Sequence, residues 1–334
     1  MPHTQDPYFT ESLLRWFAEY GRDLPWRRTR DPYAVWLSEV ILQQTRVVQG
    51  RAYWERFRER FPTVESLAAA SEDEVLRLWQ GLGYYSRARN LHAAAKAIAA
   101  QGHFPDTFEQ IRRLPGVGDY TAAAIASIAF GEGVAVVDGN VYRVLARYGG
   151  IATPVGTGAA KKEFTALAQA LLPPEEASAY NQAMMDLGAT VCTPRSPRCE
   201  ACPLAARCTA LREGRIELLP VKKPSAPPQE RRLLYIYIRC QGYTAIRRRG
   251  PGDIWQGLYE PLVLSEGDAL PDGAVLLAQG IRHALTHRLI LADFYLLDAP
   301  TRPDLPDGFL WVPESDLGPR YPKSRLFLRL LELL

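Results

Sequence analysis

Four cysteines gathered in one short stretch constrain this chain more than any other feature. Their spacing is Cys192-x6-Cys199-x2-Cys202-x5-Cys208, while Cys240 stands apart. Residues 1–12 lack the basic start and apolar block of a secretory signal, so the cluster indicates a metal site in a reducing compartment and not a disulfide framework.

Four thiolates suit either a tetrahedral zinc ion or a 4Fe-4S cluster. Zinc ribbons usually carry two close cysteine pairs, whereas here one long gap precedes the shorter ones, which favours the 4Fe-4S cluster as the cofactor. Cys240 falls in an expected strand and is predicted to be a buried apolar residue. Three arginines in and beside the loop would give it a basic rim for phosphate, namely Arg195, Arg198 and Arg207.

Length and composition predict a folded chain of two domains, because it has 334 residues with a hydrophobic fraction of 47%. Its net charge of +3 is too small to decide for or against a nucleic-acid partner. No apolar run approaches the roughly 18 residues needed to cross a bilayer. We therefore expect a cytoplasmic protein without a membrane partner, and we expect a monomer.

The chain divides into a mainly helical part and an α+β part. Residues 1–218 repeat apolar positions three and four apart, which predicts helices and no strand. A proline-rich linker is expected over 219–230. A second, α+β domain is expected over 231–334, with strands at 233–239, 243–249 and 289–297. Asp31-Pro32 is predicted to start a helix in the first part. Further helices are expected at 64–70, 72–80, 86–100, 108–113 and 141–148.

The segment Leu114 to Ala122 places two glycines, Gly116 and Gly118, between a helix end and an alanine-rich helix. Glycines there let the turn adopt positive φ and bring backbone N–H groups close to a phosphate. A helix-hairpin-helix holds a DNA strand in this way without reading its sequence. An ordinary helix-helix turn with a glycine cap explains the segment equally well.

Two carboxylates stand in unusual surroundings. Asp138 follows the apolar stretch 134–137 and either caps the next helix or stabilises a developing sugar cation. Glu39 has apolar neighbours three and four positions away, and burial there would raise its pKa so that it could act as a general acid. One raised and one ordinary carboxylate break glycosidic bonds, although Glu39 by itself also fits the polar edge of an amphipathic helix.

Amide and aromatic side chains offer possible contacts to a base stack. Gln44 follows Glu39 closely, and Tyr84 lies in a Gly-rich loop before a helix. Such side chains fill or open stacked bases. Tyr84 equally fits a core position.

Together these motifs resemble the endonuclease III superfamily of helix-hairpin-helix DNA glycosylases. The cysteine loop, the Leu-Pro-Gly-Val-Gly hairpin and Asp138 carry the wider resemblance. Within the superfamily, the chain is similar to the adenine DNA glycosylases (MutY) from about Trp26 to Cys208. The segments that carry this closer similarity are Trp36 to Thr45, Gly81 to Tyr85 and Asn181 to Gly188.

The resemblance implies a role for each candidate residue. Glu39 would protonate the leaving adenine, and Asp138 would stabilise or trap the sugar cation with support from Tyr120 and Asn140. Bifunctional relatives carry a nucleophilic lysine where this chain has Tyr120, so the resemblance implies a monofunctional enzyme. Trp26 and Arg27 would shape the adenine pocket, while Gln44 and Tyr84 would insert near the lesion.

The second domain resembles the MutT-like domain with which this family recognises 8-oxoguanine. Thr286 and His287 would contact the lesion, and Leu285 stands where the family has an aromatic residue. The Glu-rich helix of active Nudix hydrolases is absent after Gly257, so no second hydrolase activity is expected.

We therefore expect a base excision repair enzyme that removes adenine opposite 8-oxoguanine or guanine in double-stranded DNA. One alternative is an iron-sulfur glycosylase with another base specificity, such as thymine opposite guanine. The other is a non-catalytic DNA-binding or redox-sensing protein.

Overall fold

The computed structural model describes residues 6–223 and 227–334. The chain divides into two compact units, one of Met1–Trp54 with Ala94–Pro224 and the other of Glu55–Ala93 with Ser225–Leu334. Residues 55–93 thus group with the C-terminal part of the chain. The domain limits expected from sequence, 1–218, 219–230 and 231–334, do not follow this grouping and stay a prediction.

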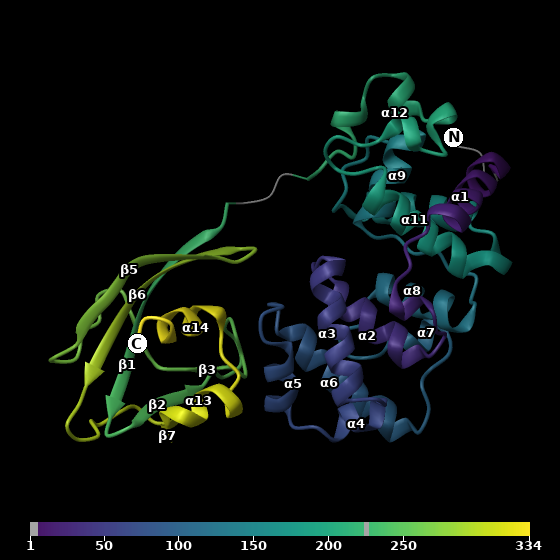
Figure 1. Ribbon diagram of the computed structural model, residues 1–334. Helices are drawn as coiled ribbons and strands as arrows, with labels where there is room; N and C mark the ends of the chain where they lie inside the picture. The colour runs from purple at the N-terminus through teal and green to yellow at the C-terminus, as the bar shows by residue number, and fades with distance from the viewer. Residues whose placement is uncertain (1–5, 224–226) are drawn as a thin grey trace. The chain divides into compact units, whose positions relative to one another are not determined.

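The helices lie mostly in the first two thirds of the chain (Figure 1). Their bounds are α1 (Pro7–Tyr20), η1 (Pro25–Arg27), α2 (Pro32–Leu42), α3 (Val47–Arg60), α4 (Val64–Ala69), α5 (Glu72–Trp79), α6 (Ser86–Gln101), α7 (Phe108–Ile111), α8 (Asp119–Phe130), α9 (Gly139–Gly149), α10 (Gly158–Leu171), α11 (Ala177–Thr190), α12 (Thr209–Arg212), α13 (Glu314–Arg320) and α14 (Arg325–Leu331). Between residues 6 and 223 no strand forms apart from an isolated bridge of Val155 to Lys222, as expected.

Local capping decides where several of these helices begin. The Asp31 side chain accepts a hydrogen bond from Tyr33 N, and Pro32 occupies the first turn of α2, which confirms the predicted start. Helix α9 begins two residues before the predicted start, because Asp138 caps it at Gly139. Helix α7 ends at Ile111, two residues before the predicted end.

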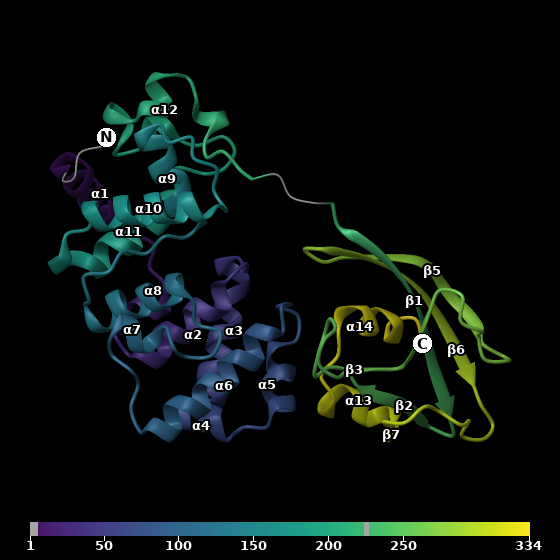
Figure 2. The same cartoon turned by 180° about the vertical axis from the view of Figure 1, so that it is seen from behind.

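The first unit has an apolar core in which α1, α9, α10 and α11 pack together. Phe9 and Leu13 of α1 meet Leu145 of α9, Phe164 of α10 and Met184 of α11, all of them buried. Figure 2 shows α9, α10 and α11 beside one another from the opposite side. Helix α2 packs on α8 in the same unit. These contacts fix the helix ends that carry the candidate site.

In the second unit, the described residues form one mixed seven-stranded sheet. Its strands are β1 (Gln229–Cys240), β2 (Tyr243–Arg248), β3 (Tyr259–Glu260), β4 (Leu262–Ser265), β5 (Val275–Ala284), β6 (Arg288–Asp298) and β7 (Phe309–Pro313). The main order is β3-β2-β1-β6-β5, with β1 and β6 parallel. The predicted strands and α+β class are therefore confirmed, and Cys240 is buried in β1 as expected.

The predicted linker is shorter than expected at its C-terminal end, because β1 begins at Gln229 and pairs there with Arg288 of β6. Residues 224–226 of that linker lie outside the described residues. Helices α13 and α14 cover one face of the sheet, where Leu317, Phe327 and Leu330 pack on Tyr235 and Phe294 (Figure 1).

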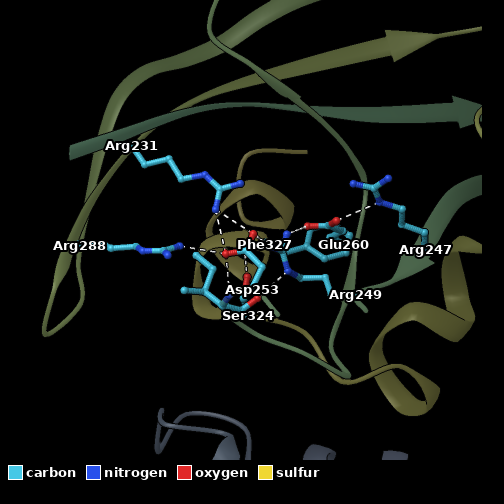
Figure 3. Close-up of polar contacts among 9 residues, drawn as sticks. Arg231, Arg247, Arg249, Asp253, Glu260, Arg288, Ser324 and Phe327 are labelled. Atoms are coloured by element: carbon cyan, nitrogen blue, oxygen red, sulfur yellow. Dashed lines mark hydrogen bonds and ion pairs between the residues drawn. The ribbon is translucent and has the colours of Figure 1, made fainter. Parts of the chain in front are cut away.

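Arginines and two carboxylates form a network inside the second unit (Figure 3). Asp253 accepts hydrogen bonds from Arg231, Arg249 and Arg288 at 2.7 to 2.9 Å. Arg249 also pairs with the buried Glu260. Burial disfavours the Asp253 carboxylate, but the arginines and the backbone N–H of Ile254 outweigh it and hold its pKa at about 2. The network ties β1, β3 and β6 to the loop after β2.

Within the described ranges, no helix is long and apolar enough to cross a membrane.

Candidate active site and cysteine loop

One pocket in the first unit brings together six of the residues singled out in the sequence. They are Trp26, Arg27, Glu39, Tyr120, Asp138 and Asn140. Its space of about 400 Å³ lies in the range of small-molecule sites. Sequence reasoning missed other lining residues, including Arg22, Ser38, Gln182 and Met185. Arg22 has no motif to mark it, whereas Gln182 and Met185 lie inside the segment 181–188 that carried the family resemblance.

Glu39 reaches the pocket from a helix that is buried on all sides. Residues 33–41 of α2 are all buried, and Glu39 itself is 6% exposed, so the polar-edge interpretation is wrong. Burial is the main cause that raises its pKa to about 7, and the nearby Asp138 adds to the rise. Tyr120 at the start of α8 donates a hydrogen bond to Glu39 Oε2 over 2.5 Å, and this bond lowers the pKa of Glu39. Glu39 can therefore hold a proton near neutral pH.

Asp138 caps α9, as one sequence interpretation expected, and it also lines the pocket. Its Oδ1 accepts hydrogen bonds from Asn140 N and Val141 N, each of 2.8 Å. Its Oδ2 accepts a 2.7 Å hydrogen bond from Asn140 Nδ2. Burial raises the pKa of Asp138 above its ordinary value, while these bonds and Arg143 oppose that rise. The bonds hold the carboxylate in one orientation.

Arg143, which sequence reasoning missed, anchors Asn140. It donates to Asn140 Oδ1 over 2.8 Å and to the carbonyls of Gly188 and Cys192 over 2.7 and 2.6 Å. Gly188 allows this approach, because a Cβ there would lie 2.5 Å from Asn140 Cβ. The start of α9 is thereby joined to α11 and to the first cysteine of the loop. Only the folded chain reveals this connection, since Arg143 is 45 residues from Gly188 and 49 residues from Cys192 in sequence.

A buried aspartate holds the arginines of the pocket. Asp186 is 0% exposed and accepts bonds of 2.7 Å from both Nη atoms of Arg27 and of 2.9 Å from Arg22 N. Burial opposes ionisation of Asp186, but the arginines outweigh it and hold its pKa below the ordinary value. Trp26 stacks edge-on against Trp54, with ring centroids 5.8 Å apart. The apolar wall and the cationic wall of the pocket are therefore both fixed in place.

Three predicted DNA contacts of the first unit do not line this pocket. Gln44 is exposed after α2 with φ of 55°. Gly116 lies exposed in the turn between α7 and α8 with φ of 72°, as predicted. Gly118 has φ of −92° and caps α8, so the expectation of positive φ there is wrong. The turn needs only one glycine in the left-handed region.

The remaining candidates belong to the second unit. Tyr84 is 49% exposed, which excludes the core alternative. Its hydroxyl lies 2.7 Å from Thr286 Oγ1. Thr286 and His287 are exposed in the turn between β5 and β6. A residue assigned to wedging and one assigned to lesion contact are thus hydrogen bonded to each other.

The four cysteines line one small pocket of the first unit. Arg147 is a buried residue of α9, and its guanidinium Nη1 donates a hydrogen bond to Cys192 Sγ over 3.4 Å. Burial, with a smaller contribution from the other three cysteines, raises the pKa of the Cys202 thiol to about 12. Four thiolates would therefore repel one another unless cationic metal held them.

The donor set suits an iron-sulfur cube better than zinc. Four sulfurs on one zinc ion lie about 3.8 Å apart, since each Zn–S bond is about 2.3 Å. Among the described residues, no three Cys, His, Asp or Glu side chains are arranged to hold a single metal ion. A cube binds each thiolate at its own corner, and the four cysteines lie around one pocket. When bound, the cluster would hold the loop in its fold.

The purified protein is expected to be brown and to contain about four iron atoms per chain. Anaerobic preparation followed by metal analysis and an absorption spectrum checks this, and Cys202→Ser should lower the iron content. Stoichiometric zinc without visible absorption would contradict the assignment. Cys240→Ser is the matched control, because Cys240 lies buried in β1 and should leave iron unchanged.

The basic rim predicted for the loop is only partly available. Arg195 and Arg198 are exposed, and Arg198 donates to Thr190 O over 2.7 Å. Arg207 pairs with Asp6 over 3.1 Å and lies over the ring of Tyr8. Arg195 is thus the arginine of this rim best placed for phosphate.

Comparisons with known proteins agree with this geometry. Residues 37–174 match the model of the HhH-GPD superfamily base excision DNA repair proteins, and residues 192–208 match the iron-sulfur binding domain of endonuclease III. The adenine DNA glycosylase of Buchnera aphidicola subsp. Schizaphis graminum is 36% identical over 254 residues, which cover 75% of this chain and 73% of that protein. The chain belongs to the adenine DNA glycosylase family. The predicted family and the predicted 4Fe-4S assignment of the cysteine loop are confirmed.

Other members are longer than this chain. The human adenine DNA glycosylase is 47% identical over 213 residues, which cover 60% of this chain and 39% of the human protein. The chain spans 39–44% of the length of the mammalian relatives that it matches.

Solved structures confirm the helix-hairpin-helix fold. A thermostable thymine-DNA glycosylase aligns with a TM-score of 0.56 and 30% identity over 62% of this chain and 96% of that one. An endonuclease III in a non-covalent DNA complex aligns with a TM-score of 0.53 and 25% identity over 62% of this chain and 95% of that one.

Proposed function

We propose that this chain is a monofunctional DNA glycosylase that removes adenine opposite 8-oxoguanine or guanine by hydrolysing the N-glycosidic bond. The observation that carries the proposal is the pairing of a protonatable Glu39 with a fixed Asp138 in one pocket. A buried acid and a second carboxylate are the groups that glycosidic cleavage requires. Membership of the adenine DNA glycosylase family supports adenine as the base.

The chemistry follows from the two carboxyl groups. Glu39 gives its proton to adenine as the bond between the sugar C1′ and the base breaks, and both bonding electrons leave with the base. The negative charge of Asp138 stabilises the sugar cation or traps it covalently. Water then adds to C1′, breaking the bond to Asp138 where one has formed, and its proton passes to the ionised Glu39, which restores both carboxyl groups. Asn140 holds Asp138 in place, and Tyr120 holds Glu39.

The pocket walls select and hold the flipped base. Trp26 offers an aromatic face, and Arg27 offers donors that Asp186 keeps in one orientation. A glycosylase must take its base out of the duplex before it can act. Gly116 and Gly118 would hold a DNA strand through backbone N–H groups, and Gln44 would enter the base stack.

Residues of the second unit would contact the lesion. Thr286 and His287 would contact 8-oxoguanine, and Tyr84 would wedge into the stack while bonded to Thr286. We also propose that residues 231–334 form a MutT-like domain and that the protein is a cytoplasmic monomer. The damaged guanine stays in the DNA.

Single-turnover release of free base from matched duplexes tests the function. Adenine should leave duplexes with adenine opposite 8-oxoguanine or guanine, and thymine should stay in a thymine:guanine duplex. Release of thymine would favour the other glycosylase class. Binding of DNA without release of any base would favour the non-catalytic alternative.

Replacement of the lesion contacts should change selectivity more than chemistry. Thr286→Val with His287→Ala removes the donors and acceptors of the turn, and good base contacts are worth about 1–3 kcal/mol of discrimination. The rate ratio between 8-oxoguanine and guanine partners should fall by about 5- to 150-fold. Leu285→Ala should have a milder effect. An unchanged ratio in the double variant would place lesion recognition elsewhere.

The wild-type protein is expected to leave an intact abasic strand, because the Tyr120 phenol cannot form a Schiff base. Borohydride should trap little protein on DNA, and Tyr120→Lys should increase trapping. Tyr120→Phe, which also lacks an amine, is the control. Efficient trapping of the wild type would contradict a monofunctional mechanism.

A further inference from the structure

Residues 133–136 lead to Asp138 without forming a helix or strand of their own. Among the described residues, no strand pairs with them, although Ala135 and Val136 are buried. Buried backbone N–H and C=O groups need partners. Two side-chain amides supply them from two different helices.

Asn181 of α11 serves one edge of the segment. Its Oδ1 accepts a 3.0 Å hydrogen bond from Val136 N, and its Nδ2 donates over 2.9 Å to Val134 O. The same Nδ2 lies 2.9 Å from Ser127 Oγ in the middle of α8. Asn181 is 1% exposed. It therefore joins the segment before Asp138 to α8, the helix that carries Tyr120.

Gln169 of α10 serves the other edge. Its Oε1 accepts a 2.9 Å hydrogen bond from Ala135 N, and its Nε2 donates over 2.8 Å to Gly133 O. Alternate residues of the segment thus face alternate amides, as they would face two neighbouring strands. Unlike Asn181, Gln169 is exposed, and it holds residues that lie farther from Asp138.

We propose that Asn181 is a positioning residue that fixes the Asp138 carboxylate by taking the place of the strand that residues 134–136 lack. Its contact at Val136 lies two residues before Asp138, and the cap of α9 holds the chain just after it. Asp138 is therefore held from both sides. This inference rests on the proposed role of Asp138 in adenine release.

The side chain must both donate and accept, which explains an amide at this position. The ionised side chain of Asn181→Asp keeps the acceptor for Val136 N but cannot donate to Val134 O. Asn181→Leu has a similar size and offers neither group. A misplacement near 1 Å can cost about 100-fold in rate, so each variant should slow adenine release by about 10- to 100-fold.

The test compares full-length Asn181→Leu and Asn181→Asp with Gln169→Leu, the matched control that also breaks two amide-backbone bonds. The measurements are the single-turnover rate on an adenine:8-oxoguanine duplex, the duplex Kd and the Tm. The Asn181 variants should lose rate while Kd stays within twofold, and Gln169→Leu should keep its rate. Ser127→Ala should also stay near wild type, because both backbone bonds of Asn181 remain.

The pH profile separates positioning from general destabilisation. Burial raises the pKa of Asp138, and Arg143 opposes that rise. Glu39 and Tyr120, whose own pKa values Asp138 raises, are the other titratable groups beside it. Release of Asp138 into water would lower its pKa, so the acid limb of the rate should move to lower pH in the Asn181 variants. Gln169→Leu should keep the wild-type limb. The proposal would be overturned if the Asn181 variants and Gln169→Leu lost rate in the same proportion to their loss of Tm and the acid limb stayed in place.

Amide hydrogen exchange gives a second test, which does not require the protein to be active. The Val136 and Ala135 amides should exchange slowly, and Asn181→Asp should leave both protected. Asn181→Leu should expose Val136 alone, and Gln169→Leu should expose Ala135 alone. Rapid exchange of Val136 in the wild type would overturn the inference even if no variant folds. Absence of adenine release by the wild type would instead reject the proposed function.

Discussion

Glu39→Gln is expected to reduce adenine release by about 10³-fold while the affinity for duplex DNA stays nearly unchanged. The amide matches the carboxyl group in shape but cannot give a proton to the leaving base, and general acid catalysis contributes about 10²- to 10⁴-fold. Single-turnover excision and a gel-shift assay measure the two quantities separately. Excision near the wild-type rate would remove Glu39 from the mechanism.

The same residue sets the alkaline limb of the pH profile. Glu39 acts in its protonated form and has a pKa of about 7, so the rate should fall as pH rises above that value. The Tyr120 hydrogen bond lowers the pKa of Glu39. Tyr120→Phe should therefore move the limb to higher pH. A limb that stays in place would show that another group titrates.

Asp138→Asn is expected to slow excision by about 10²- to 10³-fold, because the pocket loses the negative charge that faces the sugar cation. Asparagine is as good a helix cap as aspartate, so it keeps acceptors for Asn140 N and Val141 N. The Tm should change little. Excision rate, Tm and DNA affinity are the measurements.

Asp138→Ala supplies the contrast. Alanine removes the charge and the cap together, so it should cost a further ~1 kcal/mol of stability without slowing excision much more. If Asp138→Asn kept the wild-type rate while Asp138→Ala lost both rate and Tm, the carboxylate would serve only as a cap.

The sequence alone determined the features that depend on neighbours along the chain. The cysteine spacing identified the cluster loop, since the loop is one continuous segment. Asp31-Pro32 marked the start of α2 because capping acts within one turn. Strands β1, β2 and β6 were recognised from β-branched and aromatic runs. The apolar neighbours of Glu39 indicated a candidate general acid, because a charged residue is rare in such a setting.

Tertiary structure alone decided how these features meet. Glu39 and Tyr120 are 81 residues apart yet share a hydrogen bond, and the pKa of Glu39 depends on burial by helices distant in sequence. Asp138 fits a plain helix cap until its place in the pocket is known. Asp186 and Arg143 carry no signal along the chain, because Arg27 lies 159 residues from Asp186 and Gly188 lies 45 residues from Arg143.

Asn181 shows most clearly why the sequence does not reveal such long-range contacts. It lies inside a recognised motif, yet no pattern in its own helix indicates that its amide replaces a strand for residues 134–136. The grouping of residues 55–93 with the C-terminal part also has no local signal. Capping and periodicity act within a few residues, whereas burial, hydrogen-bond partners and pKa shifts depend on segments that only the folded chain brings together.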